Sequence, residues 1–357
     1  MNAISALRQV HKIRIIKLAE QKRDESKAGD AASMLSPVIA SYGDWEQELE
    51  RAKNGAAFFE LNNIETIRVS GEDASDLIHR LTMNACRNLS AGHYLVNGFT
   101  NEKGKMVDAV FQVKRPDYIE LIASSGRSEH LIAWIDKYIF IEDVVLSSQK
   151  DTAFFLLTGA ETTRIWGNES SQPFAAQSKT VDNISVEFVS AAGLVPGSIL
   201  VRCPESNREQ LRATLQQMGC KQAGSKAYHA LRIAEGIPAF NNEIVATANP
   251  YEAGLKNYIS YNKGCYIGQE VIARLDAYEK IKFSYALIGV EGAGFDTPCP
   301  LLFKDKVAGE ITSSATGPAG DVTTCIAKIR RKLTETAEIY HVSAAEEKLT
   351  AKVIKIF

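Results

Sequence analysis

The sequence predicts an α+β fold followed by a small β-barrel, because two kinds of hydrophobic repeat alternate along most of the chain and one of them disappears near its C-terminal end. Between residues 35 and 281, short runs with strand periodicity alternate with runs at helical spacing. From residue 282 onward only short strand-like runs remain. We therefore expect a helical tail and linker over residues 1–34, an α+β domain over residues 35–281 and a barrel domain over residues 282–357.

Residues 1–34 are expected to form an appendage, a short helix followed by a linker. Ala6, Val10 and Ile13 follow a loose helical spacing, and the small polar stretch over residues 27–33 is typical of a linker. Basic residues come before any acidic residue, as in an organelle targeting peptide, but acidic residues follow from Glu20 onward. We expect a cytoplasmic protein with a helical tail, with the mitochondrial matrix as the alternative if the chain is eukaryotic.

The α+β region begins with two strand signals and a helix signal. The runs Phe58–Leu61 and Ile64–Val69 have strand composition, and Ser70 with Asp73 offers an N-cap pattern for the helix that follows. Three of the predicted helices have a clear apolar face. In chain order these faces carry Ala74, Leu77, Ile78 and Leu81; Leu131, Trp134, Ile135 and Tyr138; and Leu211, Leu215 and Met218. We assign these faces to the core.

A β-hairpin is predicted around a turn at Asn101–Gly104. The strand that follows alternates, so that one face carries Val107, Ala109, Phe111 and Val113. Asp108 lies on the other face, and its apolar neighbours would raise the pKa of its carboxyl group by excluding water. Such a carboxyl group suits hydrogen bonding to, or proton exchange with, a heterocycle. From the strand pattern alone, a solvent-facing position is the commoner interpretation.

The region after residue 282 contains the strand-like runs Lys282–Val290, Leu301–Phe303, Lys306–Thr312, Val322–Ile329 and Leu349–Phe357. Gly, Pro and Asp residues separate these runs, which indicates a small β-barrel. The basic run Lys328–Lys332 has the composition of a nucleic-acid patch, but no aromatic residue interleaves with it. We therefore interpret this run as a solvated strand end.

The net charge and the length of the apolar runs argue against two classes of function, nucleic-acid binding and membrane association. The 41 basic and 43 acidic residues give a net charge of -2, so no strong field recruits nucleic acid or an anionic membrane. The apolar runs are far shorter than the roughly 20 residues that a spanning helix needs. We expect no direct nucleic-acid partner and no membrane association.

The six cysteines are scattered without a Cys-x-x-Cys pair and comprise Cys86, Cys203, Cys220, Cys265, Cys299 and Cys325. This pattern predicts reduced thiols in a reducing compartment. It argues against a permanent iron–sulfur cluster in this chain, because such centres usually use closely spaced thiolates. The six histidines do not fall at zinc-ligand spacing with these cysteines, so no metal site is predicted. A transient role for one cysteine stays open.

One segment surrounds a cysteine with residues that are expected to make its thiol reactive. This segment is Lys263-Gly264-Cys265-Tyr266-Ile267-Gly268-Gln269-Glu270. Its two glycines allow backbone conformations closed to other residues, and its last two residues suit the first turn of a helix. Cys265 is therefore expected near a helix N-terminus, where the partial positive charge and the nearby Lys263 would favour a nucleophilic thiolate. From residue types alone, a small buried cysteine packed before a helix is the commoner alternative.

This segment and two segments before it resemble the signature of the YgfZ family, folate-binding-fold proteins related to the glycine cleavage T-protein that assist iron–sulfur cluster enzymes. The two earlier segments are Arg232-Ile233-Ala234-Glu235-Gly236-Ile237-Pro238 and Asn249-Pro250-Tyr251-Glu252-Ala253-Gly254-Leu255. The resemblance covers about residues 36–330. It implies a GcvT-like folate-binding fold with a C-terminal small β-barrel.

The resemblance also implies tetrahydrofolate as the cofactor. The segment that ends at Asp108 is similar to the T-protein segment that brings an aspartate to bound tetrahydrofolate, so Asp108 is the expected folate contact. Tyr228 falls where YgfZ-type proteins carry an aromatic residue near the folate pocket, or it packs on its own helix. Arg232 would bind an anionic ligand through two hydrogen bonds, or it would pair with a nearby acid. Cys265 and Lys263 are the expected catalytic residues, and the motif is completed by Gly264, Tyr266, Gly268, Gln269 and Glu270.

Two departures from the T-protein argue against aminomethyl transfer. The acid of the Arg-x-Glu-Ala-Gly pattern is displaced by one position to Glu235, which turns it by about 100 degrees on a helix. The second aspartate of the T-protein's Asp-Asp pair is Ala109 here.

We therefore expect a folate-binding accessory protein for maturation or repair of iron–sulfur enzymes, including, by the family resemblance, enzymes that thiolate tRNA. Its expected partners are iron–sulfur enzymes or cluster carriers, together with folate. The alternatives are a tetrahydrofolate-dependent aminomethyltransferase or demethylase, which would be a one-carbon transferase, and a ligand-free interaction module.

Overall fold

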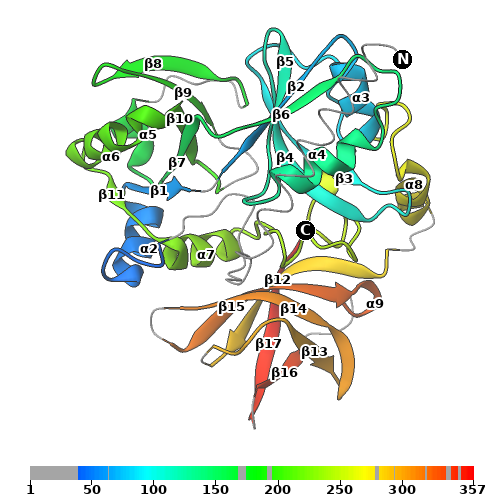
Figure 1. Cartoon of the computed structure of the whole chain (residues 1–357). Helices are drawn as coiled ribbons and strands as arrows, with labels where there is room; N and C mark the ends of the chain where they lie inside the picture. Colours follow the sequence, from blue (N-terminus) through cyan, green and yellow to red (C-terminus); the bar gives the residue numbers. More distant parts are fainter. Residues whose placement is uncertain are drawn as a thin grey trace, which may run out of the picture. The chain divides into compact units, whose positions relative to one another are not determined.

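The computed structural model describes residues 39–357 except 63, 168–173, 191–194, 278–280, 293, 318–319, 335–338 and 345–346. The expected tail and linker over residues 1–34 lie outside the described residues. The described residues form two open β-sheets, a closed β-barrel and several helices (Figure 1). The predicted α+β class with a C-terminal barrel is confirmed.

The first sheet has six strands in the order β11-β1-β7-β10-β9-β8. Its strands are β1 (Ala57–Leu61), β7 (Thr152–Thr158), β8 (Gln177–Val181), β9 (Ile184–Ser190), β10 (Ile199–Pro204) and β11 (Lys221–Gln222). One face packs with α5 (Thr162–Trp166) and α6 (Arg208–Gln217), and Leu211 and Leu215 of α6 are buried there as predicted. Every residue of β1 is buried, so this strand contributes to a core on each side of the sheet.

The second sheet has five strands in the order β3-β4-β5-β2-β6. Its strands are β2 (Thr66–Ser70), β3 (Tyr94–Thr100), β4 (Met106–Lys114), β5 (Tyr118–Ile122) and β6 (Val145–Gln149). Helices α3 (Ala74–Leu81) and α4 (Ser128–Asp136) pack on one face of it, with the predicted apolar stripes turned inward. Tyr138 lies just beyond the end of α4, where its ring packs against that of Trp134 at a centroid distance of 4.8 Å and an angle of 53°. The opposite face shares a core with the first sheet.

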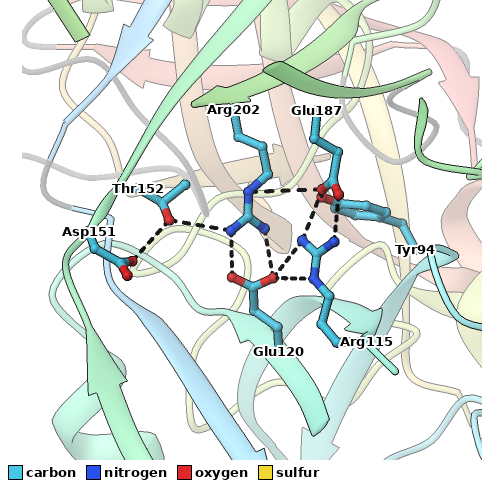
Figure 2. A network of polar contacts seen from close by, with 7 residues as sticks. All are labelled: Tyr94, Arg115, Glu120, Asp151, Thr152, Glu187 and Arg202. Atoms are coloured by element: carbon cyan, nitrogen blue, oxygen red, sulfur yellow. Dashed lines mark hydrogen bonds and ion pairs between the residues drawn. The ribbon is translucent and has the colours of Figure 1, made fainter. Parts of the chain in front are cut away.

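A charged network joins the two sheets (Figure 2). Glu120 of β5 accepts hydrogen bonds from Arg202 of β10 at 2.6 and 2.8 Å and from Arg115 at 2.9 and 2.8 Å. Arg115 also binds Glu187 of β9, which accepts a hydrogen bond from the Tyr94 hydroxyl at 2.5 Å. Two arginines therefore balance two glutamates in a site that is mostly shielded from water.

A β-bulge interrupts the predicted alternation of β4. Asp108 pairs with Phe99, whereas Met106 pairs with the next residue of β3, so that β4 has one extra residue at this point. Ala109, Phe111 and Val113 share the inter-sheet core as predicted. The prediction that Val107 shares their face is wrong, because the bulge turns Val107 toward the core beneath α3 and α4.

The closed barrel has the strand order β12-β15-β14-β13-β16-β17. Its strands are β12 (Phe283–Glu291), β13 (Cys299–Phe303), β14 (Lys306–Thr316), β15 (Val322–Arg330), β16 (Tyr340–Ala344) and β17 (Glu347–Ile356), and the short helix α9 (Arg331–Thr334) follows β15. The sequence patterns predicted all of these strands except β16. Helix α7 (Ser225–Ala234) contacts both β14 and β15 and packs against α2 (Trp45–Asn54).

Candidate functional site

The Lys263–Glu270 motif forms a loop that leads into α8 (Gln269–Ala277). Gly268 has a φ of 82°, and a Cβ atom there would lie 2.5 Å from the carbonyl oxygen of Asn101. Only glycine fits this approach without strain. The motif therefore brings the start of α8 directly against the turn of the β3–β4 hairpin.

Cys265 is exposed in this loop and carries a free thiol. The alternative that it packs as a small buried residue is therefore wrong. Cys86, Cys203, Cys220 and Cys325 are buried, and Cys299 is partly buried. Among the described cysteines only Cys265 is exposed, and it lies just before α8, as the motif predicts.

Lys263 has a different role from the one that its proximity to Cys265 suggested. Its ammonium group donates hydrogen bonds to the carbonyl oxygens of His79, Thr82 and Asn84, at 2.6 Å for His79 and 2.9 Å for Asn84. These carbonyl groups belong to the C-terminal end of α3 and the residues that follow it. Lys263 therefore caps α3, and its contacts are with these carbonyl groups rather than with the Cys265 thiol. Burial lowers the pKa of Lys263 to about 8.

His79 strengthens this attachment and was not identified from the sequence. Its Nδ1 accepts hydrogen bonds from the backbone N–H groups of Cys86 at 3.2 Å and Arg87 at 3.1 Å. Its Nε2 then carries the proton and donates to the carbonyl oxygen of Lys263 at 2.8 Å. Burial lowers the pKa of His79, which favours this neutral form. Lys263 and His79 therefore bind each other's backbone carbonyl groups.

The remaining motif residues shape the loop. The side-chain oxygen of Gln269 accepts a hydrogen bond from the backbone N–H of Tyr266 at 3.2 Å. Tyr266 is buried, and its ring faces the Lys263 ammonium group at 5.1 Å. Glu270 forms an exposed ion pair with Arg274 at 2.6 Å. Gly264 has a φ of 92°, which also favours glycine.

Asp108 is fully buried on β4, so the solvent-facing interpretation is wrong. Its Oδ1 accepts hydrogen bonds from the Ala109 N–H and the Ser124 hydroxyl, both at 2.8 Å. Its Oδ2 has no hydrogen-bond partner among the described residues. Burial raises the pKa of Asp108 to about 6, although Ser124 and Arg127 oppose this shift. The predicted direction of the shift is confirmed.

Arg127 lies over the unpartnered oxygen. Its Nε is 3.5 Å from Oδ2 of Asp108 and also lacks a hydrogen-bond partner within the described chain. The guanidinium group stacks on the ring of Phe240 at 4.4 Å. Asp108 thus provides a hydrogen-bond acceptor, Arg127 a donor and Phe240 a flat apolar surface. A polar heterocycle is typically bound by such a combination of groups. No local pattern in the sequence marked Arg127 or Phe240.

The β3–β4 hairpin connects this carboxyl group to the cysteine motif. Asp108 is in β4, and the hairpin turn contacts Gly268. Thr100, at the end of β3, donates a hydrogen bond to the carbonyl oxygen of Ile267 at 2.6 Å. The β3–β4 hairpin therefore links the strand that carries Asp108 to the loop that carries Cys265.

Tyr228 and Arg232 lie in the core. Tyr228 is buried in α7, and its ring meets that of Phe59 edge to face at 5.3 Å. Arg232 is fully buried and bonds to Glu243 at 3.3 Å and to Ser313 of the barrel at 2.8 Å. These positions correspond to the packing alternative for Tyr228 and to the acid-pairing alternative for Arg232, because both side chains are enclosed by protein.

Two absences concern the described part of the chain. No group of three or more His, Cys, Asp or Glu side chains there is arranged to hold a metal ion. The same residues include no helix with the length and apolar composition needed to cross a membrane.

Comparisons with known proteins agree with this architecture. The GCVT N-terminal domain model matches residues 21–192. A putative chloroplastic transferase from Arabidopsis thaliana is 30% identical over 79% of this chain and 67% of that protein. The tRNA-modifying protein YgfZ from Colwellia psychrerythraea is 22% identical over 62% of this chain and 68% of that protein.

A solved structure shows the same fold. The glycine cleavage system aminomethyltransferase T from Bartonella henselae superposes with a TM-score of 0.77 and covers 91% of this chain and 94% of its own, at 15% identity. An aminomethyltransferase from Bacillus pumilus is 22% identical over 88% of this chain and 92% of that protein. The chain belongs to the family of proteins that carry the GCVT N-terminal domain, and its fold is GcvT-like.

Proposed function

We propose that this chain is a YgfZ-type accessory protein that binds tetrahydrofolate and serves the maturation or repair of iron–sulfur enzymes, including enzymes that thiolate tRNA. The observation that carries the proposal is the buried Asp108 carboxyl group, whose Oδ2 has no hydrogen-bond partner among the described residues. A buried acceptor without a partner is costly unless a ligand supplies the donor. The similarity to the tRNA-modifying protein YgfZ supports the proposed role toward iron–sulfur enzymes that thiolate tRNA.

The side chains around Asp108 support the choice of tetrahydrofolate by their chemistry. Ionised Asp108 would accept hydrogen bonds from the N–H groups of the pterin ring, and protonated Asp108 would donate one. Arg127 offers an Nε–H donor beside it, and Phe240 offers an apolar surface. When bound, tetrahydrofolate would supply a carrier for one-carbon units.

Ligand entry requires a movement of Arg127. Asp108 is fully buried, and the Arg127 side chain lies over its Oδ2 while it stacks on Phe240. A ligand that binds Oδ2 must therefore displace the guanidinium group or share the carboxylate with it. In the second case Arg127 holds a compensating positive charge beside the ionised acid.

Cys265 is proposed as the residue that acts toward the partner enzyme. Its exposed thiol can be reached by a second protein without unfolding of this chain. The cap formed by Lys263 fixes the loop from one side, and Gly268 fixes it from the other. The iron–sulfur cluster is cargo of the partner in this proposal, and a single cysteine suits transient rather than permanent contact with it, because permanent clusters usually use several cysteines.

A folate-dependent aminomethyltransferase is the second candidate, and the Bacillus pumilus relative favours it by name. Two features of this chain weigh against that chemistry. Ala109 occupies the position of the second T-protein aspartate and is buried in the inter-sheet core. Glu235 is exposed at the C-terminal end of α7, whereas Asp108 is fully buried. Folate-dependent turnover of an amine substrate would favour this candidate.

The first test measures tetrahydrofolate binding by calorimetry under anaerobic, reducing conditions. We expect the Asp108→Asn variant to bind at least about tenfold more weakly, since it loses a charged acceptor. Asp117→Asn, on an exposed loop, is the matched control and should bind as the wild type does. Wild-type protein that fails to bind, or equal binding by Asp108→Asn, would remove folate from the proposal.

The second test measures the activity of an iron–sulfur enzyme in cells that lack this protein. Wild type should restore the activity, whereas Cys265→Ser and Cys265→Ala should not, at equal protein levels on an immunoblot. Restoration by all three proteins would keep the accessory role and remove Cys265 from it. Restoration by none would favour the transferase.

A further inference from the structure

A second candidate site lies between the barrel and the β3–β4 hairpin. A cleft of about 530 Å³ is bounded there by Lys105 of the hairpin turn and by residues of β12, β13, β14 and β15. Neither Asp108 nor Cys265 lines it. Its size falls within the range of about 300–1,000 Å³ that is typical of small-molecule sites.

The cleft has a surplus of positive charge. Lys105 is paired with Glu252 at 3.6 Å, and Lys328 is paired with Glu310 at 3.0 Å. Lys282 and Arg330 also line the cleft, and neither forms an ion pair within the described part of the chain. Two cations are therefore left for an external partner, because the two acids of the lining are already paired.

The barrel places these cations together through its strand register. Ile329 points into the barrel core, so its neighbours Lys328 and Arg330 point outward on one face of β15. Arg330 is paired across the ladder with Phe283, which follows Lys282. The basic run that resembled a solvated strand end thus supplies two of its residues to a lined cleft.

The same cleft offers apolar surface beside the cations. Phe283, Pro298, Pro300 and Val307 line it. Val307 is 56% exposed, so its apolar side chain is available for contact with a ligand. A ligand that covered Val307 while reaching Lys282 and Arg330 would gain both apolar burial and ion pairing.

We propose that this cleft binds a small organic anion that carries at least two negative charges on an apolar body. Lys282 and Arg330 bind the charged groups, and Phe283 and Val307 contact the apolar part. This site is separate from the proposed folate contact, since none of Asp108, Arg127 and Phe240 lines the cleft.

The test uses naphthalene disulfonate as the probe and calorimetry of the full chain as the measurement. We expect the probe to bind the wild type measurably at low salt and more weakly when salt is added. The double variant Lys282→Ala/Arg330→Ala should bind it about fivefold more weakly or worse. Both side chains are exposed, so the variant should keep its fold. Lys348→Ala/Lys352→Ala removes two cations from β17 of the same barrel, outside the lining, and should bind as the wild type does.

Cys299 reports where the probe binds, because it lines the cleft. Saturating probe should slow alkylation of Cys299, detected by peptide mass spectrometry, and leave that of Cys265 unchanged. Neutral naphthalenemethanol and inorganic phosphate should each bind more weakly than the disulfonate, since each has only half of the required chemistry. Absence of disulfonate binding, equal binding by the Lys282→Ala/Arg330→Ala variant, or equal binding of either comparison compound would overturn the proposal.

Discussion

Oδ2 of Asp108 and Nε of Arg127 lie 3.5 Å apart, each buried and each without a hydrogen-bond partner in the described chain. They form an ion pair that is close enough for attraction and too long for a good hydrogen bond. This buried pair therefore leaves one hydrogen-bond acceptor, Oδ2 of Asp108, and one donor, the Nε–H group of Arg127, unused side by side.

The Asp108→Asn variant should show a pH-dependent gain in stability. Because the folded pKa is raised to about 6, this carboxyl group favours folding below its unfolded pKa of 3.8, and that contribution is lost as pH rises through about 6. Asparagine does not titrate. The free energy of unfolding of the variant, relative to wild type, should therefore rise by about 2.5 kcal/mol between about pH 4 and pH 7.5. Urea unfolding at both pH values measures this difference, and a constant difference would contradict the raised pKa.

The Lys263→Met variant should lose the cap of α3. Three backbone carbonyl groups lose their shared donor, which should cost about 1–3 kcal/mol in the free energy of unfolding. Hydrogen exchange should also become faster in the Cys265 loop. Lys256→Met is the matched control, since Lys256 is exposed on the short helix η2 (Lys256–Tyr258). Equal effects of the two variants would show that the cap contributes nothing.

Two motif glycines form a natural comparison. Gly264 and Gly268 both have positive φ, but only at Gly268 would a Cβ meet other atoms, including a backbone oxygen at 2.5 Å. Gly264→Ala should cost about 1–2 kcal/mol from its backbone conformation alone. Gly268→Ala should cost at least about 2 kcal/mol more, because the hairpin must move. Denaturant unfolding of both variants checks this, and equal costs would argue against close contact between the loop and the hairpin.

The Glu120→Gln variant should destabilise the junction of the two sheets by about 3–5 kcal/mol, because it leaves the charges of Arg115 and Arg202 without their central partner. A double-mutant cycle that combines Glu120→Gln with Arg202→Leu tests whether the loss of stability comes from this ion pair. If Glu120 and Arg202 act as a pair, the double variant should lose less than the sum of the two single variants. Additive losses would indicate two independent sites.

Cys265 should be the first cysteine to react with iodoacetamide. Its thiol is exposed, whereas burial raises the pKa of Cys299 and Cys203 to about 11. We expect Cys265 to react at least about tenfold faster than these two. Peptide-resolved mass spectrometry over a time course measures the rates, and faster labelling of a buried cysteine would contradict the packing described above.

The sequence was informative where contacts are local. The hairpin turn is marked by Asn101 and Gly104, and the helix faces follow from spacing within each segment. The roles of Lys263 and His79 depend on contacts across 184 positions, so neither side chain carries a local sign of them. The bulge in β4 likewise breaks a pattern that remained regular in the sequence.

The β3–β4 hairpin also has a consequence for regulation. One strand carries Asp108, the turn touches the cysteine motif, and Lys105 borders the cleft at the barrel. Suppose that a ligand at one of these places favours a particular position of the hairpin and so alters the affinity at another. Thermodynamic reciprocity then requires the second ligand to alter the affinity of the first by the same factor. The hairpin is thus the element through which occupancy of one site would be sensed at the others.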